Sequence, residues 1–323
     1  MTVDRGDSGD RIIVEPVERR PAVIAVIDSA RERLDLSVFR CDEDAVLDAL
    51  ERAVRRGVRV RALVTGRAKG TKAQLKRLRK MLEALGVDVR RYGDTIVRYH
   101  AKYIVADNGP AVVASLNFTR KCFQSTCDFI LISGDEQLVA ALRRVFDGDW
   151  ENVPYRPAEA RADRLIVGPE QARAGFVALV SRATRRIRLI DPKISDPAML
   201  LLLKKREAEG IQLDIRGRSG LGSLVAHGKL LMIDDDVAAV GSISLSTLAL
   251  EFRRELAVVT RDRSSLDTLN RFWDSLPAGD AQGLSTGIPV ELSSSRSCGR
   301  RSWRRSVSRP WPRRQRNRSL IRR

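Results

Sequence analysis

An internal repeat limits the possible folds of this sequence more than any other feature. Early in each copy, equivalent residues such as Leu34 and Ile187 lie 153 positions apart. Further along, the offset falls to 127 positions, in the pairs His100 and His227, Asp107 and Asp234, Ser115 and Ser242, Asp128 and Glu255, and Phe146 and Trp273. The second copy therefore lacks about one helix and one strand, found at 71–94 in the first. A repeat of this length predicts two similar lobes in one chain, related by a pseudo-twofold axis.

The hydrophobic pattern of the first copy alternates between strand and helix. Apolar residues at helical spacing predict helices over 22–34, 42–57 and 72–86, and the segments between them predict strands over 34–39, 58–64 and 87–92. This alternation is typical of an α/β fold in which helices pack on the faces of a sheet. We therefore expect two αβ lobes with mixed sheets flanked by helices.

The lobe boundaries follow from composition and periodicity. We expect a flexible N-terminus at 1–20, a first lobe at 21–155, a second lobe at 156–278 and a tail at 279–323. The tail is rich in Arg and Ser and poor in aliphatic residues, so we expect it to be disordered. A chain of 323 residues with 43% hydrophobic content can bury the cores of two such lobes.

The net charge of +18 is concentrated in the tail, where 12 arginines and no acid follow Glu291. The remainder carries about +6, a moderate bias towards phosphodiesters or acidic lipid surfaces. Four cysteines match no zinc pattern and only two histidines are present, so we expect no metal, no cofactor and a reducing compartment. No signal peptide or membrane-spanning run is apparent, which predicts a cytoplasmic protein with at most peripheral membrane contact.

Each copy carries the same polar motif, in which His is followed by Lys after two positions and by Asp after seven. The motif residues are His100, Lys102, Asp107, Ala114, Ser115 and Asn117 in the first copy, and His227, Lys229, Asp234, Gly241, Ser242 and Ser244 in the second. On a strand, residues i and i+2 share a face, so each His and Lys should project together. Their neighbours are apolar, and burying this pair is costly unless it binds an anion.

A phosphate would use both side chains. Lysine supplies charge to its oxygens, one neutral imidazole can attack phosphorus, and a second, protonated imidazole can give its proton to the leaving oxygen. Asp128 and Glu255 lie eleven residues beyond Asn117 and Ser244, beside apolar runs. We expect these acids to orient the histidines, as the third member of a catalytic triad does.

The doubled pattern resembles the phospholipase D superfamily, whose HKD motif reads H-x-K-x4-D-x6-G-S-x-N, over about residues 20–278. The resemblance implies a metal-independent phosphodiesterase with its site between the lobes of one chain, without an obligate oligomer. It implies a covalent phosphohistidine that passes its phosphoryl group to water or an alcohol. His100 would be the nucleophile and His227 the general acid. Phosphate binding would fall to Lys102, Lys229, Asn117, Ser115, Ser242 and Ser244, and structural support to Asp107 and Asp234.

The sequence departs from the motif at two positions. Ala114 replaces glycine in the first copy, a mild change if its backbone is ordinary strand. Ser244 replaces asparagine in the second copy, which shortens one expected donor but leaves a hydroxyl. We expect altered geometry at that half of the site.

Three functions are compatible with these residues. The first is hydrolysis or exchange of a phospholipid head-group ester, as in the phospholipase D and cardiolipin synthase-like branch. The second is a nuclease that cleaves DNA or RNA with the same residues, and the third is a catalytically weak module that binds anions. Few aromatic residues can be assigned to base stacking and the charge without the tail is modest, which favours the lipid.

Overall fold

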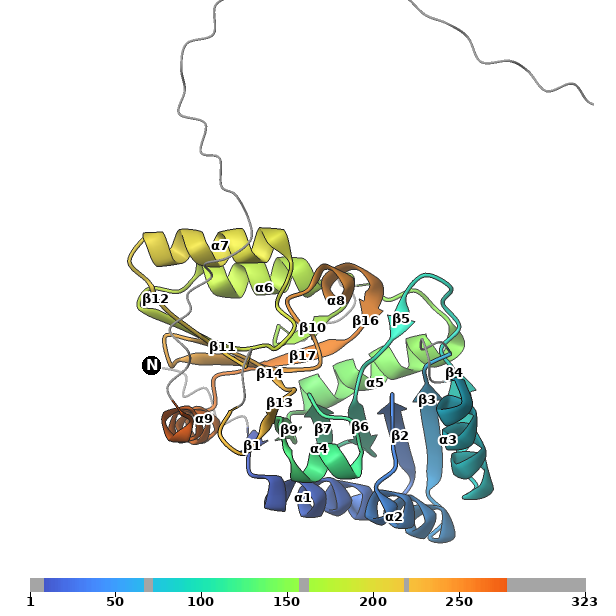
Figure 1. Cartoon of the computed structure of the whole chain (residues 1–323). Helices are drawn as coiled ribbons and strands as arrows, with labels where there is room; N and C mark the ends of the chain where they lie inside the picture. Colours follow the sequence, from blue (N-terminus) through green and yellow to red (C-terminus); the bar gives the residue numbers. More distant parts are fainter. Residues whose placement is uncertain (1–8, 67–71, 157–162, 218–220, 278–323) are drawn as a thin grey trace, which may run out of the picture. The chain divides into compact units, whose positions relative to one another are not determined.

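The computed structural model describes residues 9–66, 72–156, 163–217 and 221–277. The predicted tail at 279–323 lies outside the described residues. Two mixed sheets, each with its own set of helices, form the described part of the chain (Figure 1). The α/β fold predicted from the alternation of strands and helices is therefore confirmed.

The first sheet has seven strands, with parallel pairing on one side and antiparallel pairing on the other. In spatial order its strands are β1 (Arg11–Ile13), β9 (Ile130–Ser133), β7 (Ala111–Ala114), β6 (Tyr103–Ala106), β2 (Arg33–Val38), β3 (Arg59–Val64) and β4 (Asp88–Arg91). β2, β3 and β4 run parallel, whereas β6 lies antiparallel to β2.

The second sheet repeats this order without the last strand. Its strands are β10 (Leu165–Val167), β17 (Leu256–Thr260), β15 (Val237–Gly241), β14 (Lys229–Ile233), β11 (Arg186–Ile190) and β12 (Gln212–Arg216). Within the described ranges, β4 is the one strand of the first sheet that has no counterpart in the second. The structure thus confirms the internal repeat and the loss of one strand from the second copy.

The helices repeat in the same way. The first lobe carries α1 (Pro16–Ser29), α2 (Asp44–Arg55), α3 (Lys72–Ala84), α4 (Arg120–Gln124) and α5 (Glu136–Glu151). The second carries α6 (Ala172–Ser181), α7 (Pro197–Ala208), α8 (Thr247–Phe252) and α9 (Arg263–Ser275). Among the described residues, α3 has no equivalent, so α3 and β4 together account for the shorter second copy.

The N-terminal boundary expected from the sequence is wrong. Residues 11–13 form an edge strand that pairs antiparallel with β9, and α1 begins at Pro16 instead of residue 22. Proline is tolerated at the first position of a helix, because the N–H that it lacks would have no partner there. The hydrophobic pattern did not predict this segment, because a charged residue anchors it. Arg19 is fully buried and donates to four backbone carbonyls.

Three groups of buried side chains hold the sheets and helices together. One packs α1 and α2 against the first sheet, and another packs α6 and α7 against the second. The third contains α5, α9 and residues of both sheets, including Phe129 and Phe272, whose rings meet edge to face at 5.7 Å. Because this core is shared, the two lobes fix each other's position.

Candidate active site

Two very short parallel strand pairs cross between the lobes and carry the site. β5 (Arg98–Tyr99) of the first lobe pairs with β16 (Arg253–Arg254) of the second, and β8 (Thr126–Cys127) pairs with β13 (Val225–Ala226). Each of these four strands ends directly before a predicted catalytic residue. The N–H of His100 donates to the carbonyl of Arg254 at 3.0 Å, which continues the first pair up to the site.

The histidines do not lie on a strand, contrary to the expectation from the motif. His100 stands between β5 and β6, and His227 stands between β13 and β14. At each histidine the chain leaves the short strand that pairs with the other lobe and enters a strand of its own lobe's sheet. His and Lys still come together, because the ammonium of Lys102 donates to the carbonyl of His100 and that of Lys229 donates to the carbonyl of His227 at 2.6 Å.

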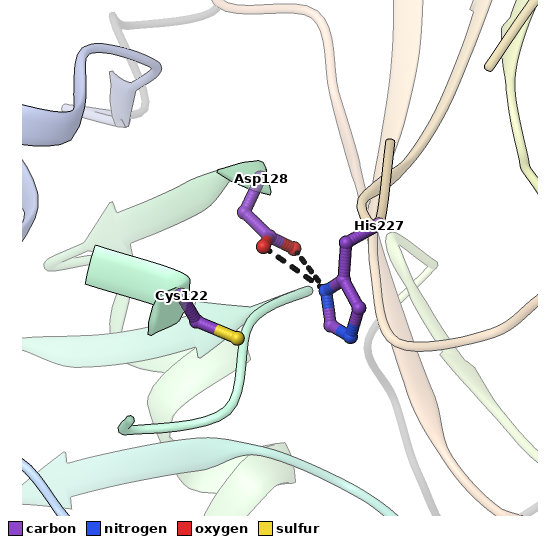
Figure 2. A group of neighbouring side chains, drawn as sticks. All are labelled: Cys122, Asp128 and His227. Carbon is purple, nitrogen blue, oxygen red and sulfur yellow. Dashed lines mark hydrogen bonds and ion pairs between the residues drawn. The ribbon is translucent and has the colours of Figure 1, made fainter. Parts of the chain in front are cut away.

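Each histidine is held by the acid of the opposite lobe. Nδ1 of His227 donates to Asp128, with both carboxylate oxygens at 2.9–3.0 Å (Figure 2). Nδ1 of His100 contacts Oε1 of Glu255 in the same way. Both acids are fully buried, whereas each imidazole remains partly exposed. With Nδ1 engaged, Nε2 of each ring is the nitrogen free to react.

The two acids differ in their surroundings. Asp128 accepts hydrogen bonds from Ser115 at 2.6 Å and Thr126 at 2.5 Å besides His227. Burial alone would raise the pKa of Asp128, but these donors and the charge of His227 lower it below its usual value. Oε2 of Glu255 is buried and has no hydrogen-bond partner among the described residues, and burial raises the pKa of Glu255 to about 7 despite nearby cations.

The imidazole of His100 lies in a strongly cationic environment. The centroid of its ring lies 4.5 Å from that of the Phe39 ring, and Nζ of Lys102 lies 2.9 Å from Nδ1. Burial, together with the charges of Lys102, Arg253 and Lys229, lowers the pKa of His100 well below its usual value. Burial also lowers the pKa of Lys102 well below its usual range. His100 is therefore held neutral, with a free Nε2.

Asn117 and its counterpart Ser244 are not equivalent. Oδ1 of Asn117 is buried and accepts no hydrogen bond from the part of the chain that the structure describes, so this oxygen is not used in holding that part together. The hydroxyl of Ser244 is buried and donates to Asp191 at 3.0 Å. A phosphate contact of Ser244 stays a prediction, and it would require this hydroxyl to give up its bond to Asp191.

The hydroxyls of Ser115 and Ser242, for which phosphate contacts are predicted, are engaged by other groups of the protein. Each side chain is 1% exposed, and each is used within the fold. Ser115 donates to Asp128 and accepts from the N–H of Phe129, whereas Ser242 accepts from the N–H of Leu256 at 3.3 Å. Their hydroxyls hold the strands that carry the two acids.

Asp107 and Asp234 lie away from the histidines, at the far ends of their strands. Asp107 accepts from the N–H groups of Arg31, Glu32 and Arg33, at the start of β2. Asp234 accepts from the N–H groups of Thr184, Arg185 and Arg186, at the start of β11. Burial opposes ionisation, but these backbone bonds lower the pKa of both carboxyls. Both acids tie sheet strands together in equivalent ways.

The replacement of glycine by Ala114 is accommodated. Ala114 lies in β7 and is not among the described residues with positive φ. At the equivalent Gly241, an added Cβ would lie 2.1 Å from the carbonyl oxygen of Leu256. The glycine of the second copy is thus required by close packing, and the first copy does not share that constraint.

The sequence analysis missed two cations near the site, Lys193 and Arg253. Arg253 lies 3.8 Å from Oε1 of Glu255. Partial burial and the charges of Lys229 and Arg253 lower the pKa of Lys193. The sequence could have indicated Lys193, because the 153-residue offset of the repeat aligns it with Arg40, and both residues follow equivalent strands.

Cys122, Asp128 and His227 offer ligand atoms within 4.8 Å of one another, as a metal site would (Figure 2). Both oxygens of Asp128 already accept from hydroxyl and imidazole donors, so hydrogen bonds account for the arrangement. We assign no metal to it. Cys41, Cys122 and Cys127 are free thiols in the described chain.

Comparison with known proteins finds a family model and several relatives that match part of the chain. Residues 23–150 match the family model described as cardiolipin synthase, PLD-like domain. Cardiolipin synthase A of Pseudomonas aeruginosa is 28% identical over 147 residues, which cover 44% of this chain and 30% of that protein. Mitochondrial cardiolipin hydrolase of Xenopus laevis is 33% identical over 132 residues, which cover 40% of this chain and 59% of that protein. The chain thus matches between about a third and three-fifths of these relatives' lengths.

Both lobes also resemble a solved structure. Polyphosphate kinase from Porphyromonas gingivalis aligns with a TM-score of 0.68 and 16% identity, over 82% of this chain and 46% of that one. At this identity the likeness concerns the fold alone. Within the described segments, no helix is both long and apolar enough to cross a bilayer. Residues 23–150 thus match a phospholipase D-like domain, as the motif within this segment indicates.

Proposed function

We propose that this chain is a phospholipase D-type phosphodiesterase or phosphatidyltransferase that works through a phosphohistidine on His100. One observation carries the proposal: each histidine is held through Nδ1 by a buried acid of the opposite lobe. Two oriented imidazoles, with Lys102, Lys229 and Asn117 nearby, are the groups that a two-step phosphoryl transfer needs.

The reaction would proceed in two displacements. Nε2 of His100 attacks phosphorus, the bond from phosphorus to the leaving oxygen breaks, and Nε2–H of His227 protonates that oxygen. Water or an alcohol then attacks the phosphohistidine and gives its proton back to His227, and the P–N bond breaks to restore His100. Lysine ammonium groups stabilise the charge on the phosphoryl oxygens in both steps.

The different environments of the acids support these roles. His100 is the better nucleophile because its lowered pKa keeps the ring neutral. Asp128 has a lowered pKa and so remains ionised, which stabilises the imidazolium form of His227 that a general acid requires. Glu255, whose pKa is raised to about 7, is less suited to stabilising an imidazolium in acid solution.

A phospholipid is the favoured substrate. The matched relatives are named for cardiolipin synthesis and hydrolysis. Exposed apolar side chains also precede the two strands of the β5–β16 pair: Ile96, two residues before β5, is 71% exposed, and Phe252, at the end of α8, is 45% exposed. Such side chains suit peripheral contact with lipid better than contact with a nucleic-acid backbone.

The test is to incubate the full-length protein, with a chelator, with phospholipid vesicles and with single- and double-stranded DNA. Release of the head group supports the proposal, strand cleavage supports the nuclease, and binding without turnover supports an anion-binding module. His100→Asn and His227→Asn should each lower kcat by about 1,000-fold or more. Wild-type rates in both variants, with unchanged thermal unfolding, would refute the site.

The phosphohistidine can be sought directly. Acid quench during turnover of a ³²P-labelled substrate should label His100, and the label should be absent from His100→Asn. A label on His227 instead would reverse the two roles.

A further inference from the structure

The two acids of the site are held by different groups at equivalent positions. The 127-residue offset of the repeat aligns Arg253 with Thr126, and each lies two residues before its acid. The hydroxyl of Thr126 donates to Asp128 at 2.5 Å. Nη1 of Arg253 lies 3.8 Å from Oε1 of Glu255, which is too long for a hydrogen bond but close for two opposite charges. The second copy therefore holds its acid with a cation instead of a hydroxyl donor.

The oxygen that Arg253 contacts is the one that holds the proposed nucleophile. Oε1 of Glu255 also contacts Nδ1 of His100. Arg253 lies in β16, which pairs with β5, and the two strands end directly before Glu255 and His100 (Figure 1). The side chain of Glu255 is fully buried and that of Arg253 is 20% exposed, so solvent screens the two charges weakly. The charge of Arg253 thus acts on Glu255 and, through the shared oxygen, on His100.

Several charged groups face the His100–Glu255 pair from the elements around it. They come from the segment before β6, the start of β14, the residues after β11, and β16, and are Lys102, Lys229, Asp191, Lys193 and Arg253. Burial raises the pKa of Glu255 to about 7, and the charges of Lys102, Arg253 and Lys229 oppose this rise. A bound phosphate would neutralise the two lysines and so favour protonation of Glu255. The charge of Arg253 is needed most at that point.

We infer that Arg253 is a positioning residue for the nucleophile: its guanidinium keeps Glu255 ionised, so that Glu255 accepts the Nδ1 proton of His100 and Nε2 of that ring stays free to attack. The inference rests on the proposed phosphohistidine function and adds to it a residue that the first lobe replaces with Thr126. Without this cation the carboxylate loses an opposite charge and the imidazolium form of His100 loses a repelling one. Both changes favour uptake of a proton by the pair.

The first test is the pH profile of kcat/KM on phosphatidylglycerol vesicles. In Arg253→Met the acid limb should move up by about one pH unit, as expected for the loss of an opposite charge at this distance. The alkaline plateau should change by less than about threefold, because Glu255 is ionised there in either protein. Arg253→Lys retains the charge and should keep the limb within about 0.3 units of the wild type.

Arg98→Met is the matched control, because it removes an exposed arginine that lies directly opposite Arg253 in the β5–β16 pair. It reduces attraction to an acidic vesicle equally and should leave the acid limb in place. A lower rate of Arg253→Met at every pH, with the limb unmoved, would overturn the inference and indicate contact of Arg253 with the phosphoryl group. An unchanged profile would overturn it as well.

A titration without substrate separates this inference from the proposed function. The chain has two histidines, so His227→Asn leaves the imidazole NMR signals of His100 alone. In that background Arg253→Met should raise the midpoint of the His100 signal by about one pH unit, and Arg98→Met should not. If the wild type turns over no phospholipid, the proposed function fails, and the midpoint still decides the role of Arg253: a rise supports it, and an unmoved midpoint overturns it.

Discussion

At the scale of single residues, the two halves of the site differ most in their acids. Asp128 accepts from two hydroxyls, whereas the residue equivalent to Thr126 in the second copy is Arg253, which offers Glu255 only a longer contact. This explains why the pKa of Asp128 is lowered and that of Glu255 is raised to about 7. The difference between the two carboxyls thus arises from substitutions around two otherwise equivalent acids, and the proposed division of roles between the histidines would follow from it.

Glu255→Gln should change the pH profile as well as the rate. In the wild type, kcat/KM should fall below about pH 7 as the His100–Glu255 pair takes up a proton. In the variant the acid limb should move to lower pH, because the remaining group, His100, has a pKa well below its usual value. Asp128→Asn is the comparison, since it should lower the rate and leave the acid limb in place. An unchanged midpoint in Glu255→Gln would contradict this account.

The same substitution should stabilise the folded protein at high pH. The pKa of Glu255 rises from 4.5 to about 7 on folding, so stability is lost as the pH rises through that range and the buried side chain must ionise. Thermal unfolding should therefore show a difference, Tm of Glu255→Gln minus Tm of wild type, that is larger at pH 8 than at pH 5. A difference that does not vary with pH would contradict the prediction.

At the scale of strands and helices, the sequence predicts what is periodic or repeated. The β/α order, the loss of one helix and one strand, and the grouping of two His-Lys pairs with two acids follow from spacing. The partner of each acid could not be predicted, because it depends on strands of two residues that pair between the lobes and carry no pattern of their own. The start of α1 was missed for a similar reason, since Arg19 is ordered by contacts with α4 and β8.

The strand pair that carries His227 depends on a close approach at Gly228. A Cβ at this position would lie 2.7 Å from the carbonyl oxygen of Cys127 and 2.9 Å from the ring of Phe129. Gly228→Ala should therefore push β13 from β8, move His227 away from Asp128 and lower kcat by roughly 100-fold, as misplaced catalytic groups do. The measurement is kcat, together with the NMR signal of the Nδ1 proton of His227.

The matched control for Gly228→Ala is Ala101→Gly, the reciprocal change in the first lobe. Ala101 is buried and its carbonyl accepts from Ser37, a bond that glycine retains. This variant should cost about 1 kcal/mol of stability through backbone entropy. Wild-type kcat in Gly228→Ala would mean that the β8–β13 contact does not position His227.

At the scale of the whole molecule, a site formed from two lobes requires their relative position to be fixed. Arg254 is a buried contact between them: it donates to Asp149 on α5 at 3.0 Å, to the carbonyl of Gly168 at 2.7 Å and to Glu170 at 2.6 Å. Burial raises the pKa of Asp149 to about 7, although the charge of Arg254 opposes this. The carbonyl of Arg254 also accepts a hydrogen bond from the N–H of His100, so the contact adjoins the proposed site.

Arg254→Met should destabilise the entire described fold, because it leaves two carboxylates without their cation. Removing one partner of a buried ion pair typically costs about 3–5 kcal/mol, which corresponds to a fall in Tm of about 10 °C for a chain of this size. The deficit should be smaller at pH 5 than at pH 8, since Asp149 is neutral once protonated and its pKa rises further without Arg254. Arg52→Gln, which removes an exposed ion pair with Asp28, should change stability by less than about 0.5 kcal/mol.

If the lobes share one core, far-UV circular dichroism and tryptophan fluorescence should follow one coincident transition in both variants. Separate transitions would show that the lobes unfold independently.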